Sequence, residues 1–136
     1  MKQIYETTLT NLNGTSGTVD AENGFSVGLL PVLKADSTHT NPEQLIGSAW
    51  ATCLNATIIS ILKAKNLNLK SKVEVNVKLF FDDITRYHFT LDAYASIESM
   101  DLEQAEKIIH TAHRFCPVSK LIGDKPGVTL HTVKYE

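Results

Sequence analysis

The sequence predicts an α+β fold with elements in the order β-β-β-α-β-β-α-β. Apolar and polar residues alternate over residues 73–81 and 89–97, as in strands that bury one face. Apolar residues recur at steps of three and four over residues 45–62 and 102–116, as in amphipathic helices. These patterns indicate a β-hairpin between one long central helix and one shorter helix.

The N-terminal region predicts an antiparallel β-unit. Residues 2–9 form the expected opening strand. Residues 18–20 and 25–30 flank Asn23-Gly24, a dipeptide typical of tight hairpin turns. We therefore expect these two segments to pair with each other.

A polar loop over residues 31–39 precedes the long helix, which we expect to end near Lys65. Its apolar stripe consists of Leu45, Ile46, Ala49, Trp50, Cys53, Leu54, Ile58, Ile61 and Leu62. The uncharged run over residues 44–62 approaches the length that spans a bilayer, but it contains Ser, Thr and Asn. A helix buried in protein fits this run better.

The second helix has Asp101 as its predicted N-cap and ends at Pro117. Its predicted buried stripe is Leu102, Ala105, Ile108, Ile109, Ala112 and Cys116. Residues 123–127 predict a turn-rich connection, and residues 128–135 predict a closing strand.

Composition limits the classes of function. A chain of 136 residues with 43% hydrophobic content can bury one core, so we expect a single domain over residues 1–136. The net charge is −2, and no dense cluster of Lys and Arg is present, which argues against nucleic acid and anionic membranes as partners. No signal peptide is recognised, so a cytoplasmic location is expected.

Two cysteines, Cys53 and Cys116, each lie in an apolar helical segment. Because structural disulfides are rare in the cytosol, the pair is either a working dithiol or two inert core thiols. Cys53 lies in mid-helix without a neighbouring cation, so desolvation would raise its pKa and leave it inert. Cys116 lies at a helix C-terminus, where the dipole disfavours a thiolate, which suits a resolving thiol better than an attacking one.

Glu43 has two interpretations. It can complete a capping box with Thr40 at the start of the long helix. Alternatively, its carboxylate orients a cation beside Cys53. Ten residues along one helix span about 15 Å, so a functional Glu43 has to reach Cys53 from a second subunit.

A metal site is a competing possibility. His110, His113 and Cys116 lie on one side of the second helix, but a fourth ligand is not evident. The remaining histidines are isolated in the sequence: His39, His88 and His131. No glycine-rich phosphate loop, nucleophile elbow or paired-carboxylate motif is found.

Two segments carry a resemblance to a known family. Residues 40–47 read Thr-Asn-Pro-Glu-Gln-Leu-Ile-Gly with a cysteine ten positions after the glutamate, and residues 112–119 read Ala-His-Arg-Phe-Cys-Pro-Val-Ser. In this order they resemble the signatures of the OsmC/Ohr family of organic hydroperoxide reductases. Cys-Pro-Val-Ser with Ile46-Gly47 is closer to the OsmC branch, whereas Gln44 is closer to Ohr, so the subfamily stays open.

The resemblance implies an intertwined homodimer around long central helices and thiol-dependent reduction of organic hydroperoxides. It assigns Cys53 as the peroxidatic thiol, Cys116 as the resolving thiol, and Glu43 as the carboxylate that holds an arginine over Cys53. The implied reductant is a dithiol such as the lipoyl group of a lipoylated protein. No metal, flavin or other cofactor is implied.

One departure from the family concerns the activating arginine, which is expected within residues 13–16. This chain has Asn-Gly-Thr-Ser there, and its only arginines are Arg86 and Arg114. A thiol of pKa ~8.5 is only a few per cent ionised at neutral pH, so the attack on peroxide would be slow without a cation. Lys34, in the loop before the long helix, is the nearest candidate substitute.

The expected reaction passes through a Cys53 sulfenic acid and a Cys53–Cys116 disulfide, which an external dithiol reduces. Trp50, Leu54 and Ile58 are the expected substrate pocket, which would favour an alkyl or lipid hydroperoxide. The alternative is a catalytically weakened OsmC-like protein that binds a hydrophobic ligand.

Overall fold

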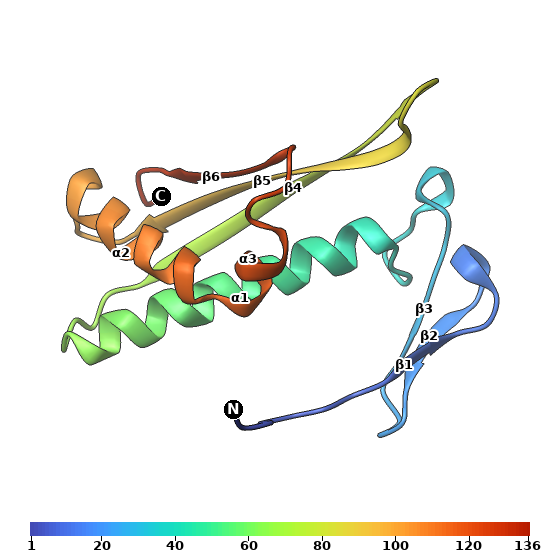
Figure 1. Cartoon of the computed structure of the whole chain (residues 1–136), viewed down its shortest axis with the longest axis horizontal. Helices are drawn as coiled ribbons and strands as arrows, with labels where there is room; N and C mark the ends of the chain where they lie inside the picture. The colour runs from blue at the N-terminus through green and yellow to red at the C-terminus, as the bar shows by residue number, and fades with distance from the viewer. The chain divides into compact units, whose positions relative to one another are not determined.

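A computed structural model describes all 136 residues of the chain (Figure 1). The elements follow in the order β1-β2-β3-α1-β4-β5-α2-α3-β6, which confirms the predicted α+β plan and adds one short helix. The chain divides into two compact units, Met1–Leu45 and Ile46–Glu136. Helix α1 begins in the first unit and continues through the second.

The N-terminal unit contains a three-stranded antiparallel sheet in the order β1-β2-β3. Its strands are β1 (Leu9–Asn11), β2 (Thr18–Ala21) and β3 (Ser26–Gly28). The hairpin predicted from Asn23-Gly24 is confirmed, with Gly24 at φ +98°. A glycine is suited to this position because it adopts positive φ without steric cost.

The opening strand predicted over residues 2–9 is wrong in its extent. Only Leu9–Asn11 is a strand, and Leu9 pairs with Ala21, the last residue of β2. Because β2 has only four residues, the chain before Leu9 has no further partner on it. The length of β2, rather than the residue pattern of β1, therefore limits how far the two strands pair.

Helix α1 (Pro42–Ala64) starts differently from the predicted capping box. The N-cap is Asn41, whose Oδ1 accepts a hydrogen bond from the Gln44 backbone N–H at 2.8 Å. The Thr40 hydroxyl instead donates to the side-chain oxygen of Gln44 at 3.1 Å. Pro42 takes the first helical position, where its missing N–H costs nothing. The capping role proposed for Glu43 is therefore wrong.

The C-terminal unit contains a second three-stranded sheet in the order β4-β5-β6. Its strands are β4 (Ser71–Asp82), β5 (Arg86–Ile97) and β6 (Val128–Thr132). The predicted β4–β5 hairpin is confirmed, and β6 pairs with β5 in parallel. Parallel pairing requires a crossover connection, which α2 (Leu102–Phe115) and α3 (Pro117–Ile122) supply.

The second predicted helix is confirmed as α2, with the Asp101 side chain accepting from the Gln104 N–H at 2.9 Å. Pro117 ends it as expected, but the same proline opens α3. The sequence reasoning missed this second role, which follows from the preference for proline at the first helical position. The closing strand is shorter than predicted and ends at Thr132.

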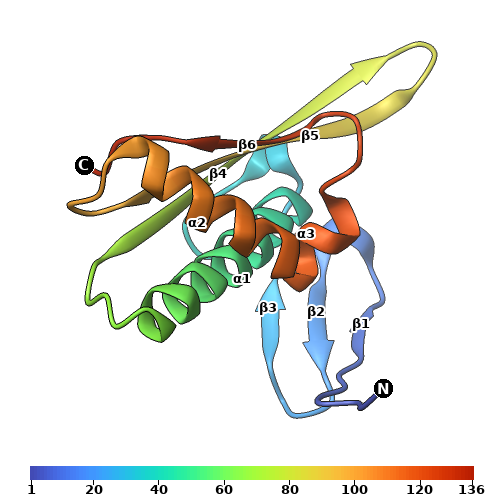
Figure 2. The same cartoon turned by 60° about the vertical axis from the view of Figure 1, so that its left-hand side comes forward.

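The core of the C-terminal unit lies between α1, α2 and one face of the sheet (Figures 1 and 2). The buried residues of α1, β5, α2 and the α2–α3 junction form one cluster: Trp50, Leu54, Ile58, Leu62, Leu91, Ala93, Ala95, Ile97, Ala105, Ile108, Ile109, Ala112 and Cys116. The turn that joins β4 to β5 lies at the end of the hairpin that extends beyond α2, α3 and β6 (Figure 2). Apolar side chains are exposed there, including Ile84 at 91%.

Helix α1 has the length and composition of a membrane-spanning helix, with a mean hydropathy of 1.6 over its most apolar window. However, four of its large apolar side chains belong to the core cluster. Its Asn55 accepts a hydrogen bond from the Ser71 hydroxyl of β4 at 2.7 Å. These contacts are those of a core helix that packs against a sheet.

Candidate functional site

The two cysteines come together inside the C-terminal unit. Cys53 lies in the middle of α1 and is half-buried, and Cys116 lies between α2 and α3 with 0% of its surface exposed. Both are free thiols, and the thiol of Cys53 interacts with that of Cys116 and with the backbone N–H of Val118. The crossover that returns the chain to β6 thus carries Cys116 to the apolar face of α1.

Cys116 lies both at the C-terminal end of α2 and at the N-terminal end of α3. It follows the last residue of α2, where its own N–H donates to Ala112 at 2.8 Å, and it is also the N-cap of α3. Its Sγ accepts a hydrogen bond from the Ser119 N–H at 3.4 Å. The expectation that Cys116 sits only at a helix C-terminus is therefore incomplete. The backbone N–H of Val118 interacts with the Cys53 sulfur, so N–H groups from the first turn of α3 face both thiols.

A buried hydrogen bond joins α1 to the start of α3. The indole Nε1–H of Trp50 donates to the Ser119 hydroxyl at 2.8 Å. Trp50 precedes Cys53 by about one helical turn, and Ser119 is three residues after Cys116. The contact therefore links the segments that carry the two cysteines.

The surroundings of Cys53 favour its protonated form. Burial raises the pKa of this thiol, and its contact with Cys116 raises the pKa further. The N–H of Val118 acts in the opposite direction and lowers the pKa of Cys53, but it does not overcome the desolvation. The expected effect of burial on Cys53 is thus confirmed, and a nucleophilic role requires an additional cation.

Glu43 is the second residue of α1, ten positions before Cys53. The regular rise of the helix separates the two by about 15 Å. One carboxylate oxygen of Glu43, Oε2, is buried without a hydrogen-bond partner. A buried carboxylate oxygen is costly unless it is paired, so this atom is suited to a cationic donor.

The cationic side chains lie on separate elements. Lys34 ends a short 3-10 turn, Val32–Lys34, in the N-terminal unit. Arg86 lies at the β4–β5 turn, with its guanidinium carbon 4.8 Å from the centre of the Phe81 ring. Arg114 lies in the last turn of α2, with its guanidinium carbon 5.7 Å from the centre of the Phe115 ring. Thr15, where an arginine was expected, lies in the 3-10 turn Gly14–Ser16.

The histidines of α2 face different partners. His110 is exposed and lies 3.6 Å from the carboxylate of Glu106. The His113 ring lies against Trp50, with ring centres 6.4 Å apart, and its Nδ1 is buried without a partner. Burial lowers the pKa of His113, and the charge of His110 lowers it further. No group of three or more metal-ligating side chains converges in the structure.

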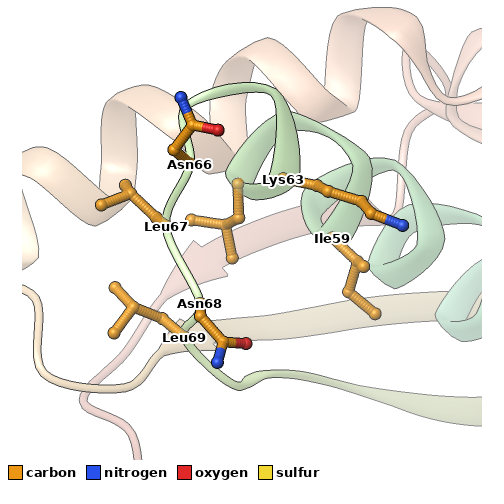
Figure 3. A pocket seen from close by; sticks show the side chains of 7 residues that line it. Ile59, Lys63, Asn66, Leu67, Asn68 and Leu69 are labelled. Atoms are coloured by element: carbon orange, nitrogen blue, oxygen red, sulfur yellow. The ribbon is translucent and has the colours of Figure 1, made fainter.

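Trp50, Leu54 and Ile58, the expected substrate pocket, are each 0% exposed and belong to the core cluster. A separate hollow of about 460 Å³ lies at the C-terminal end of α1 (Figure 3). Ile59, Leu67 and Leu69 line it together with the polar Lys63, Asn66 and Asn68. Neither cysteine lines this hollow.

The sequence reasoning missed Val118 and Ser119 as neighbours of the sulfurs. A signal for them was present, because Pro117 directly after Cys116 marks the first turn of a helix. In a helix that Cys116 caps, the N–H groups two and three positions later are free to donate. Nothing in the sequence pointed to the contact between Trp50 and Ser119, which are 69 positions apart.

Comparison with known proteins gives the family of this fold and site. The family model described as OsmC-like protein matches residues 35–131, a range that contains both cysteines and Glu43. An organic hydroperoxide resistance protein-like 1 from Staphylococcus epidermidis is 37% identical over 131 residues, 93% of this chain and 94% of the relative. An organic hydroperoxide resistance protein-like protein from Mycoplasma genitalium is 31% identical and covers 98% of this chain and 99% of its own length.

Solved structures agree with this relationship. A crystal structure from Lactobacillus casei, of a protein named for a redox role, has a TM-score of 0.89 at 29% identity and covers 98% of this chain and 94% of that one. The structure of the organic hydroperoxide resistance protein OhrB of Bacillus subtilis has a TM-score of 0.80 at 24% identity, covering 96% of this chain and 98% of that one, and supports the fold alone. The chain therefore belongs to the OsmC-like family, whose members include organic hydroperoxide resistance proteins.

Proposed function

We propose that this chain is a thiol peroxidase that reduces organic hydroperoxides to alcohols, with Cys53 as the attacking thiol and Cys116 as the resolving thiol. The observation that carries this proposal is the meeting of two free thiols from α1 and the α2–α3 junction in an apolar core. Family membership supports the same class of activity, since relatives are named for resistance to organic hydroperoxides.

In the first step, the Cys53 thiolate attacks the outer oxygen of the hydroperoxide. The O–O bond breaks, the alkoxide takes a proton and leaves as the alcohol, and Cys53 becomes a sulfenic acid. Trp50, Leu54 and Ile58 stay the predicted pocket residues, and their apolar surface would favour an alkyl or lipid chain over hydrogen peroxide.

In the second step, the Cys116 sulfur attacks the Cys53 sulfenic acid and water leaves, forming a Cys53–Cys116 disulfide. An external dithiol, which we propose to be a lipoyl group on a protein, then reduces the disulfide by two thiol–disulfide exchanges. No metal or organic cofactor takes part. Two free cysteines suit a reducing compartment, so we propose that the protein works in the cytoplasm as one domain over residues 1–136.

Activation of Cys53 requires a cation, because the surroundings of this thiol raise its pKa. We propose that Lys34 provides it and that Glu43 holds the ammonium group in place. The unpartnered Oε2 of Glu43 supports this role, because it is a buried acceptor without a donor. Lysine offers a point charge rather than the planar bidentate contact of arginine, so the site would be slower than one with arginine.

We further propose an intertwined homodimer in which Glu43 of one subunit serves Cys53 of the other. The separation of about 15 Å along α1 supports this arrangement, because a single subunit cannot bring the two side chains together on one straight helix. Composite sites of this kind form naturally across a two-fold axis, where each contact occurs twice.

Uncovered surfaces of the C-terminal unit agree with a dimer. One face of α1 is exposed although it carries small or uncharged residues, namely Ser48, Ala49, Thr52, Ala56, Ile59 and Ser60. Small residues allow two helices to approach closely. The hairpin end also exposes Phe80, Phe81 and Tyr87. Exposed apolar surface of this kind is typical of an interaction site.

The alternative function is a weakened OsmC-like protein that carries a hydrophobic ligand. The hollow at the C-terminal end of α1 gives it little support, because Lys63, Asn66 and Asn68 contribute polar groups to the lining (Figure 3). The absence of an arginine from residues 13–16 is the observation that favours it.

The deciding experiment follows consumption of cumene hydroperoxide with dihydrolipoamide as reductant. Wild type and Cys53→Ser are compared in parallel, with hydrogen peroxide as a second substrate. We expect turnover in wild type, none in Cys53→Ser, and a preference for the organic substrate. Equal turnover in both proteins would exclude Cys53 as the attacking group, and no turnover in wild type would favour the ligand carrier.

A further inference from the structure

We propose that Trp50 and Ser119 form a positioning pair for the disulfide step: their hydrogen bond holds the first turn of α3 so that the Cys116 sulfur stays beside Cys53. This inference rests on the proposed thiol peroxidase function and names residues outside the reacting pair. Neither side chain exchanges atoms with the substrate. Their task is to keep Cys116 within reach of the sulfenic acid after Cys53 has been oxidised.

The pair connects the two segments that carry the reacting sulfurs. Trp50 is fixed on α1 about one turn before Cys53, and its Nε1–H donates to Ser119 Oγ at 2.8 Å. The backbone N–H of the same Ser119 donates to Cys116 Sγ at 3.4 Å. A continuous path therefore runs from the rigid helix α1 through one serine to the resolving sulfur.

The three residues on this path are all buried, so their polar groups have no water to bond with instead. Trp50 is 0% exposed, Ser119 is 3% exposed, and Cys116 is 0% exposed. A buried indole N–H or hydroxyl that loses its hydrogen-bond partner is not compensated by water, so the pair strongly favours the arrangement in which both groups are bonded. The Trp50 ring also packs against His113, with ring centres 6.4 Å apart, which limits its movement. The register of α3 against α1 is thus set by a polar contact within an apolar core.

The disulfide step is the one that depends on this register. The Cys116 sulfur has to displace hydroxide from the Cys53 sulfenic acid, forming an S–S bond while the S–O bond breaks, and the thiol proton leaves with water. Attack along this line demands close and directed approach, and small misplacements reduce rates strongly. The first oxidation takes place between Cys53 and the hydroperoxide and does not use the Cys116 sulfur. Loosening α3 should therefore slow the second step far more than the first.

Two variants each remove one partner of the hydrogen bond between Trp50 and Ser119. Ser119→Ala removes the hydroxyl acceptor and keeps the backbone N–H that faces Cys116. Trp50→Phe removes the N–H donor and keeps an aromatic ring. Ser96→Ala is the matched control, because Ser96 is also a fully buried serine in the same unit, but its hydroxyl has no hydrogen-bond partner.

The reduced full-length proteins are mixed with one equivalent of cumene hydroperoxide. Loss of hydroperoxide reports the first step, and trapping of the sulfenic acid with dimedone, followed by mass spectrometry, reports the second. We expect Ser119→Ala and Trp50→Phe each to lower the ratio of the second rate to the first by roughly tenfold, the effect of losing one buried hydrogen bond. Ser96→Ala should leave that ratio unchanged.

The double variant separates a positioning pair from two independent effects. If the hydrogen bond is the cause, Trp50→Phe combined with Ser119→Ala should be no slower than the worse single variant. Ser119→Thr, which restores the hydroxyl, should recover the ratio. Lower thermal stability with an unchanged ratio in both single variants would reduce the contact to a purely structural one and overturn the proposal.

A second readout does not need peroxidase activity. Oxidised glutathione forms a mixed disulfide on Cys53, and Cys116 then closes the intramolecular bond and releases reduced glutathione. The closure rate should fall roughly tenfold in Ser119→Ala and stay unchanged in Ser96→Ala. If wild type closes the disulfide but consumes no hydroperoxide, the proposed function fails while the positioning pair stands. Equal closure rates in wild type and Ser119→Ala would overturn the positioning pair alone.

Discussion

The thiol of Cys53 in α1 faces the thiol of Cys116 at the junction of α2 and α3. Cys116 belongs to the buried core cluster, and the half-buried Cys53 packs against that cluster. The resolving thiol is thus shielded from solvent beside the thiol that attacks the hydroperoxide.

Replacing Cys116 with serine should stop turnover but allow one round of oxidation. Cys53 can still attack the hydroperoxide, whereas serine cannot resolve the sulfenic acid into a disulfide. Mass spectrometry of the treated variant should find Cys53 as a sulfenic or over-oxidised acid. Wild type treated in the same way should contain an intact Cys53–Cys116 bond. Peroxide-treated wild type without that bond would remove Cys116 from the mechanism.

The reactivity of Cys53 should rise with pH beyond the range of an ordinary thiol. Burial and the contact with Cys116 raise the pKa of Cys53, so its thiolate forms above the usual value of about 8.5. Alkylation of Cys53 by iodoacetamide, followed by peptide mapping, should therefore reach half its maximal rate at a higher pH than a model thiol. A midpoint below that of the model thiol would mean that a cation already overrides the desolvation.

The same shift has a consequence for stability. In the unfolded chain Cys53 ionises at its ordinary pKa, while in the folded protein it keeps its proton to higher pH. The free energy of unfolding should therefore fall as the pH rises above about 8.5 and through the folded pKa. Urea titrations between pH 7 and 10 should show a smaller fall for Cys53→Ala than for wild type.

Much of the fold could be predicted from the sequence because its elements have strong local signals. The alternation over β4 and β5, the Asn23-Gly24 turn and the Asp101 cap each specify a structure from neighbouring residues. The start of α1 was harder, because Thr40 and Asn41 are both good caps and only the fold selects Asn41. The extent of β1 depends on its partner β2 and could not be read from its own residues.

The same difference between local signals and long-range packing applies to the residues of the candidate site. Cys53, Cys116 and Glu43 came from short motifs, and the structure brings the two cysteines together. The contact between Trp50 and Ser119 depends on how the crossover packs against α1, and no local pattern encodes it. Pro117 carries two local signals, because a proline both ends the preceding helix and suits the first position of the next one, α3.

Acid should destabilise the protein partly through His113. Burial and the charge of His110 lower the pKa of His113, so the folded state favours the neutral ring. The unfolded chain binds this proton below a pH of about 6.5, so the free energy of unfolding should decrease as the pH falls from there through the folded pKa. His113→Gln should show a smaller decrease between pH 7.5 and 5.5 in urea titrations.

His131→Gln is the control for this effect, because His131 is an exposed histidine on β6. It should leave the acid dependence close to that of wild type. The same decrease in His113→Gln and wild type would mean that other groups cause the acid dependence.

Replacing Lys34 with alanine should slow oxidation of Cys53 at neutral pH by several-fold, if the ammonium group stabilises the thiolate. The deficit should shrink as the pH rises through the raised pKa of Cys53, where the thiol ionises without help. Stopped-flow oxidation rates measured from pH 6 up to about pH 10 test both parts. Lys65→Ala, which removes a lysine just beyond the end of α1, is the matched control and should have no effect.

The converse variant restores the expected arginine. Thr15→Arg places a guanidinium in the Gly14–Ser16 turn and should increase the oxidation rate at neutral pH, because arginine can pair with a carboxylate through two hydrogen bonds. If Lys34→Ala changes neither rate nor alkylation at any pH, Lys34 is a solvated loop residue and the ligand-carrier function gains support.

Mixing two impaired variants should restore activity if the sites are shared between subunits. Glu43→Ala lacks the carboxylate that holds the Lys34 ammonium group, so its homodimer should be several-fold slower than wild type, whereas the Cys53→Ser homodimer lacks the thiol and should be inactive. In a mixed dimer, Glu43 from the Cys53→Ser subunit meets Cys53 from the Glu43→Ala subunit and forms one complete site. Random exchange gives about half mixed dimers, hence about one quarter of the wild-type sites. Dihydrolipoamide-dependent hydroperoxide consumption after denaturation and refolding together measures this recovery, and refolding each variant separately is the control. About 15 Å of α1 separates Glu43 from Cys53 in one subunit. Sites confined to single subunits would leave the refolded mixture no more active than the average of the two variants refolded separately.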